Sequence, residues 1–212
     1  MNKPRVDYQK IMDTELEKIT ASGKIPKLFL HACCAPCSSY CLEYLTEYFE
    51  VTLFYYNPNI SPSSEYEYRL NELKRLMQEQ PHKYPVSICD APYDPQIFFE
   101  MAKGHEKDPE RGERCQMCIS QRLELTAKMA AEGGYDYFTT TLSLSPYKDE
   151  QFINELGREL AEKYGIAYLF SDFRQRNGFE RSIELSNQYN LYQQNFCGCA
   201  FSKHYPEDNM IR

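Results

Sequence analysis

Short apolar segments alternate with longer polar ones along most of the chain, and this alternation constrains the fold more than any other feature. Strands are predicted at 27–31, 51–56, 85–89, 135–142 and 166–170. Helices are predicted at 38–49, 63–80, 94–103, 115–132, 149–164 and 179–189. Strands that are separated by helices pair in parallel, because each crossover returns the chain to the same end of the sheet. The sequence therefore predicts a doubly wound, mostly parallel, Rossmann-like α/β sheet of about five strands.

Capping residues mark two ends of these segments. Ser63 or Ser64 begins a long polar segment and is expected to cap its helix, because a hydroxyl accepts a bond from an unpaired backbone N–H. Gly133 follows the helix predicted at 115–132 and is expected to end it.

The length of 212 residues suits one α/β domain. Residues 1–26 contain no clear strand and are expected to form a helical arm that packs on the sheet of a domain spanning 27–212. No run approaches the roughly 18 apolar residues that span a bilayer. The N-terminal residues also lack the apolar stretch of a signal peptide. These features predict a cytoplasmic protein that has no membrane partner.

Cysteine is the unusual residue of this chain. The nine cysteines are Cys33, Cys34, Cys37, Cys41, Cys89, Cys115, Cys118, Cys197 and Cys199. Clustered cysteines in a cytoplasmic chain indicate metal or redox chemistry rather than structural disulfides. In an open parallel sheet, ligands bind at the carboxyl ends of the strands, and the first cysteine group directly follows a predicted strand. We therefore expect a metal-binding catalytic domain at 27–212.

Two pairs of cysteines have the arrangement of metal ligands. Cys115 and Cys118 form a C-x-x-C unit near a helix start, where residues three apart share a helix face. Cys33 and Cys34 are adjacent, and in a turn before a helix both can face a multi-atom cluster. Four thiolates suit a [4Fe–4S] cluster or tetrahedral zinc, and spacing alone does not choose between them or exclude free thiols. Cys37 forms a C-x-x-x-C unit with Cys33 and is a candidate ligand of a second metal.

The pair Cys197 and Cys199 forms a C-x-C unit, which differs from the metal-ligand pairs. Two cysteines separated by one glycine can close a small, strained disulfide, and strained disulfides are the labile, redox-active kind. Further metal ligands or inert thiols are the alternatives. Cys41 and Cys89 are expected to be packed core residues, and His31 a hydrogen-bonded histidine at the end of a strand.

The charges limit how the chain can bind nucleic acid. The net charge of −7 argues against broad coating of nucleic acid but allows a local basic patch. Basic residues flank the later cysteines, which raises the option of phosphate binding; they are Arg111, Arg114, Arg122, Arg174, Arg176, Arg181 and Lys203. The sequence contains no glycine-rich phosphate loop, which weakens an ATP-dependent interpretation.

Several motifs, taken in order, resemble those of the epoxyqueuosine reductase family of the QueH type. They lie at 31–38, 55–60, 65–69, 112–118, 139–143, 145–148 and 192–199, and the resemblance covers about 27–203. It implies reduction of epoxyqueuosine at the wobble position of certain tRNAs to queuosine, the last step of that modification pathway.

The resemblance also implies the cofactor and the redox residues. It places a [4Fe–4S] cluster on the positions that match Cys33, Cys34, Cys115 and Cys118. It makes the pair matching Cys197 and Cys199 a redox-active disulfide. Members of the family hold an extra mononuclear iron beside the cluster. The position of Cys37 can be aspartate in some members, so the ligand set of the second site is open here.

A tRNA substrate implies further contacts. The anticodon stem-loop would bind a local patch, with the modified base in the crevice and stacked on Tyr55 or Tyr56. The backbone phosphates are expected at Arg111, Arg114, Arg174 and Arg176. The motif residues Arg69 and Lys148 are also expected to bind substrate. Candidate proton donors are Tyr147, Lys148 and Asp90, and an external electron donor is required.

Two other functions compete with this interpretation. A cluster-dependent tRNA sulfurtransferase would also place cysteines on an α/β sheet, but it needs an ATP pyrophosphatase loop that the sequence lacks. A zinc-stabilised RNA-binding module without catalysis would use the cysteines only to hold loops. Acid-labile sulfide in the purified protein would exclude the second.

Overall fold

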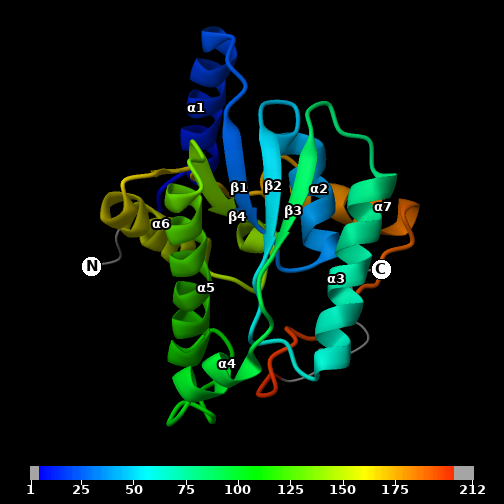
Figure 1. The fold of residues 1–212 in the computed structure, drawn as a ribbon, viewed down its shortest axis with the longest axis vertical. Coiled ribbons are helices and arrows are strands. Elements are labelled where there is room, and N and C mark those ends of the chain that lie inside the picture. Colours follow the sequence, from blue (N-terminus) through cyan, green and yellow to red (C-terminus); the bar gives the residue numbers. More distant parts are fainter. Residues whose placement is uncertain (1–4, 203–212) are drawn as a thin grey trace.

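Five parallel strands form the centre of the molecule, as the alternation predicts (Figure 1). The computed structural model describes residues 5–202, apart from the side chain of Asp90. The strands are β1 (Lys27–His31), β2 (Glu50–Tyr55), β3 (Val86–Asp90), β4 (Tyr137–Thr140) and β5 (Ala167–Tyr168). Their order in the sheet is β3-β2-β1-β4-β5, and every neighbouring pair is parallel.

This order places a switch point between β1 and β4. The chain first builds outward from β1 through β2 to β3, and it then crosses back to build β4 and β5 on the other side. Leu30 pairs with Leu53 of β2 on one side and with Thr139 of β4 on the other. Connections that diverge from two neighbouring strands leave a crevice beyond their carboxyl ends, where ligands bind in such sheets.

Helices cover both faces of the sheet. They are α1 (Tyr8–Ser22), α2 (Ala35–Leu45), α3 (Ser63–Glu79), α4 (Pro95–Met101), α5 (Glu113–Glu132), α6 (Glu150–Tyr164) and α7 (Gly178–Gln188), with a short 3-10 helix η1 (Thr141–Leu144) after β4. Figure 1 shows α5 and α6 on one side of the strands and α2, α3 and α7 on the other. The predicted doubly wound α/β fold is confirmed.

The period-two alternation of strand side chains explains the two layers. Leu28 and Leu30 of β1 pack into a core with α1, α2 and α3. Phe29, between them, points to the opposite core with α5 and α6, where its ring stacks on Phe54 at 5.0 Å between centroids. Successive strand residues face opposite sides, so a strand covered on both faces is apolar throughout.

The N-terminal segment contains α1, which buries one apolar stripe. Met12, Leu16 and Ile19 recur at helical spacing and join the core on the α2 side of the sheet. The Tyr8 ring stacks on Phe170, and its hydroxyl donates to Glu155 of α6 at 2.8 Å. These contacts hold α1 on the body of the protein.

Several segments differ in detail from the sequence predictions; the helix predicted at 38–49, for example, is α2 (Ala35–Leu45). No serine caps α3, because Pro62 occupies the cap position and Ser63 is already helical. The fourth strand stops at Thr140, because the Thr140 hydroxyl accepts from the Leu142 N–H and starts η1. The edge strand β5 pairs over only two residues.

Within the described residues, no helix combines the length and the apolar composition that a membrane crossing needs. The last ten residues of the predicted 27–212 domain, which include Lys203, lie outside the described residues.

Candidate functional site

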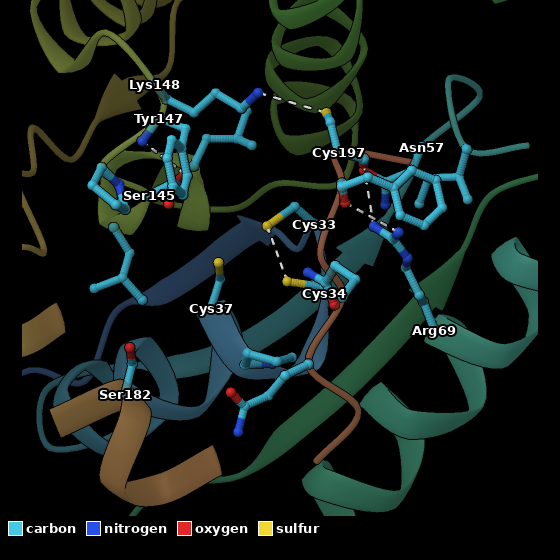
Figure 2. Close-up of a pocket in the computed structure, with 18 of the residues that line it drawn as sticks. Cys33, Cys34, Cys37, Asn57, Arg69, Ser145, Tyr147, Lys148, Ser182 and Cys197 are labelled. Atoms are coloured by element: carbon cyan, nitrogen blue, oxygen red, sulfur yellow. Dashed lines mark hydrogen bonds between the residues drawn. The ribbon is translucent and has the colours of Figure 1, made fainter. Parts of the chain in front are cut away.

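A cavity opens beyond the carboxyl ends of β1 and β4, at the switch point of the sheet (Figure 2). Its volume is about 1030 Å³ including the space open to solvent. Its lining comes from the turn before α2 and the first turn of α2, the loop after β2, η1 and the loop after it, α7, and residues 193–197, with one arginine each from α3 and α5. We call residues 191–202 the C-terminal strap. In Figure 1 the strap passes between α3 and α4.

Three thiols meet at the floor of the cavity. Cys33 and Cys34 occupy the turn between β1 and α2, and Cys37 lies in the first turn of α2. The sulfur atoms of Cys33 and Cys34 are 3.6 Å apart, and all three sulfur atoms lie within 4.8 Å of one another. A tetrahedral ion with metal–sulfur bonds of about 2.3 Å separates its sulfur ligands by roughly 3.8 Å. The three thiols are therefore close enough to share one metal ion.

Hydrogen bonding makes the three thiols unequal. Hydrogen bonding with Cys33 and Cys37, together with the nearby Arg69, holds the pKa of Cys34 well below its ordinary value. The same arrangement raises the pKa of Cys33 to about 11 and that of Cys37 well above its ordinary value. The Thr141 hydroxyl also donates to the Cys33 sulfur at 3.3 Å. The cluster therefore accepts one negative charge readily, and neighbouring cations or a metal must stabilise more.

A buried arginine faces the cysteines without a carboxylate partner. Arg122 of α5 is 3% exposed, lines the cavity, and donates from Nε to the Cys118 carbonyl at 3.1 Å. Its Nη1 donates to the Asn57 amide oxygen at 3.3 Å. Within residues 5–202 no carboxylate forms an ion pair with it. Burial lowers the pKa of its guanidinium, but the nearby Cys118, Cys197, Cys33 and Cys115 raise it more. A buried cation without a counter-ion is costly, so the site is built to hold anionic sulfur.

The C-x-x-C unit lies in the first two turns of α5. Cys118 is 6% exposed and packs with Phe98, Ala102 and Cys199, and burial raises the pKa of its thiol. Cys115 and Cys118 do not join the three-thiol cluster within 4.8 Å. The structure therefore brings together two of the four predicted cluster ligands directly and leaves the other two on the neighbouring helix, near Arg122.

The strap is anchored through its backbone. Arg69 of α3 donates from Nη1 to the Cys197 carbonyl at 3.2 Å and from Nη2 to the Phe196 carbonyl at 3.4 Å. Cys199 forms an antiparallel bridge with Ile60. Gly198 has a φ of 97°, and a Cβ there would lie 3.2 Å from Arg69 Nη1, so a glycine is required between the cysteines. Both thiols of the pair are free.

The other predicted site residues lie in different surroundings. Lys148 and Arg69 line the cavity. Tyr56 is 7% exposed and packs in the core, where its ring stacks on Phe54, so it presents no open ring face to the cavity. Its carbonyl lies 3.1 Å from Nε2 of His31, which is fully buried and has a pKa lowered to about 3 by desolvation. His31 is thus a neutral histidine with both ring nitrogens bonded.

The arginines predicted to bind phosphate form internal contacts. Arg174 lies 2.7 Å from both Asp172 and Glu150, and Arg176 pairs with Asp13 of α1. Two others bond backbone carbonyls: Arg111 that of Pro146, and Arg114 those of His105 and Glu106. These arginines do not line the cavity.

Sequence reasoning missed the amide residues of the cavity. Asn57, Asn59, Gln193 and Gln194 line it, whereas sequence reasoning assigned them no role beyond membership of the motifs at 55–60 and 192–199. Asn57 donates to the Ala32 carbonyl at 2.9 Å while it accepts from Arg122, so it links the end of β1 to the buried cation. The signal was available: a polar residue directly after a buried strand marks the ligand-binding edge of a parallel sheet.

Fold and site together define a class: a doubly wound α/β protein with a thiol-lined, cation-supported cavity at its switch point. Comparison with known proteins shows which family of this class the chain belongs to. Residues 28–205 match the family model described as Epoxyqueuosine reductase QueH. The chain belongs to this family of oxidoreductases.

Individual relatives span nearly the whole chain. A Staphylococcus epidermidis protein named Epoxyqueuosine reductase QueH is 42% identical over 95% of this chain and 87% of its own length. A protein of the same name from Thermotoga maritima is 34% identical over 82% of this chain and 89% of its own length. Among solved structures, a predicted subunit of tRNA methyltransferase from Methanocaldococcus jannaschii matches with a TM-score of 0.50 and 15% identity, over 74% of this chain and 76% of that one. The last similarity shows the fold alone.

Proposed function

We propose that this chain reduces the epoxide of epoxyqueuosine at the wobble position of tRNA and so gives queuosine, the last step of queuosine biosynthesis. The family supports the reaction class. The observation that carries the proposal is the buried Arg122, which lines the same cavity as Cys33, Cys34 and Cys197 and has no carboxylate partner among residues 5–202. That arrangement suits electron transfer to a ligand in the cavity.

The cysteines supply a donor set that suits iron and sulfur. Cys33, Cys34, Cys115 and Cys118 would hold a [4Fe–4S] cluster, and Cys37 would hold an additional mononuclear iron beside it. The unpaired charge of Arg122 supports this assignment, because a thiolate-ligated cluster is anionic. When bound, such a cluster supplies single electrons at low potential.

The Cys197 and Cys199 pair fits the stoichiometry of the reaction. Removal of the epoxide oxygen leaves an alkene, releases water, and consumes two electrons and two protons. Oxidation of two thiols to one disulfide releases two electrons and two protons, so one turnover of the pair balances one epoxide. An external electron donor must then return the pair to the dithiol.

The tRNA would contact the protein through a local patch, because the chain as a whole carries a charge of −7. The modified base would enter the cavity past Lys148, and Arg174 and Arg176 would contact backbone phosphates. The amide groups of Asn57, Asn59, Gln193 and Gln194 offer hydrogen bonds to a flipped base.

Metal analysis and turnover of one preparation test the proposal. Protein purified without oxygen should contain roughly four acid-labile sulfides and four to five irons per chain. With dithionite and methyl viologen as reductant, it should convert epoxyqueuosine in tRNA to queuosine, detected by mass spectrometry of the nucleosides. Cys118→Ala should lose both the sulfide and the conversion.

The matched control is Cys41→Ala, because Cys41 is a fully buried cysteine of α2 that packs in the core and does not line the cavity. This variant should keep the iron, the sulfide and the conversion. About one zinc per chain without sulfide would overturn the proposal in favour of a zinc-stabilised RNA-binding module. A sulfur-containing nucleoside formed only with ATP would overturn it in favour of a sulfurtransferase.

A further inference from the structure

The two thiols of the strap lie in unlike surroundings although only one glycine separates them. Cys197 lines the cavity, whereas Cys199 is 9% exposed and packs with Phe98, Ala102 and Cys118. The Cys199 sulfur accepts from the Phe201 N–H at 3.4 Å. Gly198, with its positive φ, turns the chain between them. A reagent in the cavity therefore meets Cys197 first.

A lysine approaches Cys197 from the opposite wall. The Lys148 ammonium lies 3.6 Å from the Cys197 sulfur, and Figure 2 shows this contact across the mouth of the three-thiol cluster. The loop that carries Lys148 is held in place. The Lys148 N–H donates to the Ser145 carbonyl at 3.2 Å, and Arg111 bonds the Pro146 carbonyl at 2.9 Å. Asp149, the next residue, caps α6.

The charges around each sulfur reinforce this difference. Lys148, Arg122 and Arg69 face Cys197 from three different segments and lower the pKa of its thiol, although burial opposes them. The thiols of Cys118 and Cys199 are its other titratable neighbours. Cys199 is instead enclosed by Phe98 and Ala102.

We infer that Cys197 is the reactive thiol of the pair, that Cys199 is the protected one, and that Lys148 is the positioning residue that keeps Cys197 in its reactive form. The role of this asymmetry in turnover rests on the proposed function. Its chemical basis does not, because a thiolate beside an ammonium reacts with any electrophile that enters the cavity.

Alkylation by iodoacetamide, followed by mass spectrometry of each cysteine peptide, tests the inference without substrate. In the anaerobic protein as purified, Cys197 should react at least tenfold faster than Cys199 at pH 7. Lys148→Met should slow Cys197 roughly tenfold at pH 7 and move the midpoint of its pH–rate profile upward by about one pH unit. Lys148→Arg should restore most of the rate, because the charge returns.

Lys163→Met is the matched control, because Lys163 is an exposed lysine that pairs with Glu124 on α5 away from the cavity. It should leave both alkylation rates unchanged. Equal rates at the two cysteines, or an unmoved midpoint in a folded Lys148→Met protein, would overturn the inference. If the asymmetry is found but no epoxyqueuosine is reduced, the proposed function fails while the inference stands. If reduction occurs, Lys148→Met should lower kcat with little change in KM.

Discussion

Arg69 and Cys197 are 128 positions apart in the sequence, and the Arg69 guanidinium lies 3.2 Å from the Cys197 carbonyl. The same guanidinium bonds the Phe196 carbonyl and pairs with Glu65 on its own helix. One side chain of α3 thus fixes the backbone of the strap at the cavity wall. The position of Cys197 therefore depends on this link as well as on Gly198 of the strap.

Arg69→Lys should loosen the strap, because a lysine cannot bond two carbonyls and a carboxylate with one rigid fork. We expect the Ser61 N–H, which donates to the Gly198 carbonyl, to exchange with solvent at least tenfold faster. Hydrogen exchange by NMR measures this. The control is Arg75→Lys, also on α3, whose guanidinium bonds the carbonyls of Tyr189 and Asn190 before the strap begins. Equal effects of both variants at Ser61 would show that Arg69 has no special role.

Arg122→Met should leave the free energy of unfolding almost unchanged but lower the iron and sulfide content of the protein. The metal-free protein should unfold in urea with a free energy within about 1 kcal/mol of the parent, because removal of an uncompensated buried charge offsets the bond lost by Asn57. Iron and sulfide content should fall several-fold, because the anionic cluster loses its counter-ion. Arg122→Lys should keep more of the iron than Arg122→Met does. Full iron content in Arg122→Met would contradict the assigned role.

His31 should make stability depend on pH in the acid range. Its pKa is near 3 in the folded state against an ordinary value of 6.5, because burial disfavours its charged form. Below pH 6.5 the unfolded chain binds a proton that the folded chain refuses, so stability falls as the pH drops. The loss between pH 8 and 5.5 should be about 1.4 kcal/mol from this residue. Urea titrations at pH 8 and pH 5.5 should show this loss in the free energy of unfolding of the metal-free parent. His31→Gln, which lacks the titrating ring, should not show it.

Gly157→Ala should destabilise the protein although alanine is the better helix former. A Cβ at Gly157 of α6 would lie 2.4 Å from the ring of Tyr168 on β5, so helix and strand would have to separate. We expect a loss of about 1–3 kcal/mol in the free energy of unfolding, opposite in sign to the usual gain of about 1 kcal/mol. Glu159→Ala, at an exposed position of the same helix, should be neutral or stabilising.

Replacement of both Arg174 and Arg176 by alanine tests the predicted phosphate contacts. If they bind the tRNA backbone, the affinity should fall and the slope of log K against log salt should flatten by about one to two units. Both side chains already pair with carboxylates, so the slope decides between a phosphate contact and a purely internal ion pair. An unchanged slope would assign them to the internal role. Filter binding at several salt concentrations gives the measurement.

Much of the site was visible in the sequence because it follows the sheet. Cys33 and Cys34 could be placed at the ligand-binding edge, since a buried apolar strand ends just before them. Arg122 was noted only as a basic neighbour of the C-x-x-C unit. Its role was hidden, because sequence cannot show that a charged side chain on a helix is buried without a carboxylate. Tyr56 illustrates the converse: its predicted contact with the base stays a prediction, and the sequence could not show that its ring packs on Phe54.

The sequence by itself determined the parallel sheet, its helical layers and the grouping of the cysteines, because strand periodicity and local spacing are properties of neighbouring residues. Only the tertiary structure decided which distant groups meet. It brought Lys148 to Cys197 and Arg69 to the backbone of the strap, and it put Arg122 among four cysteines. Burial and charge pairing depend on what the other elements leave around a side chain, and that environment exists only after the sheet has assembled.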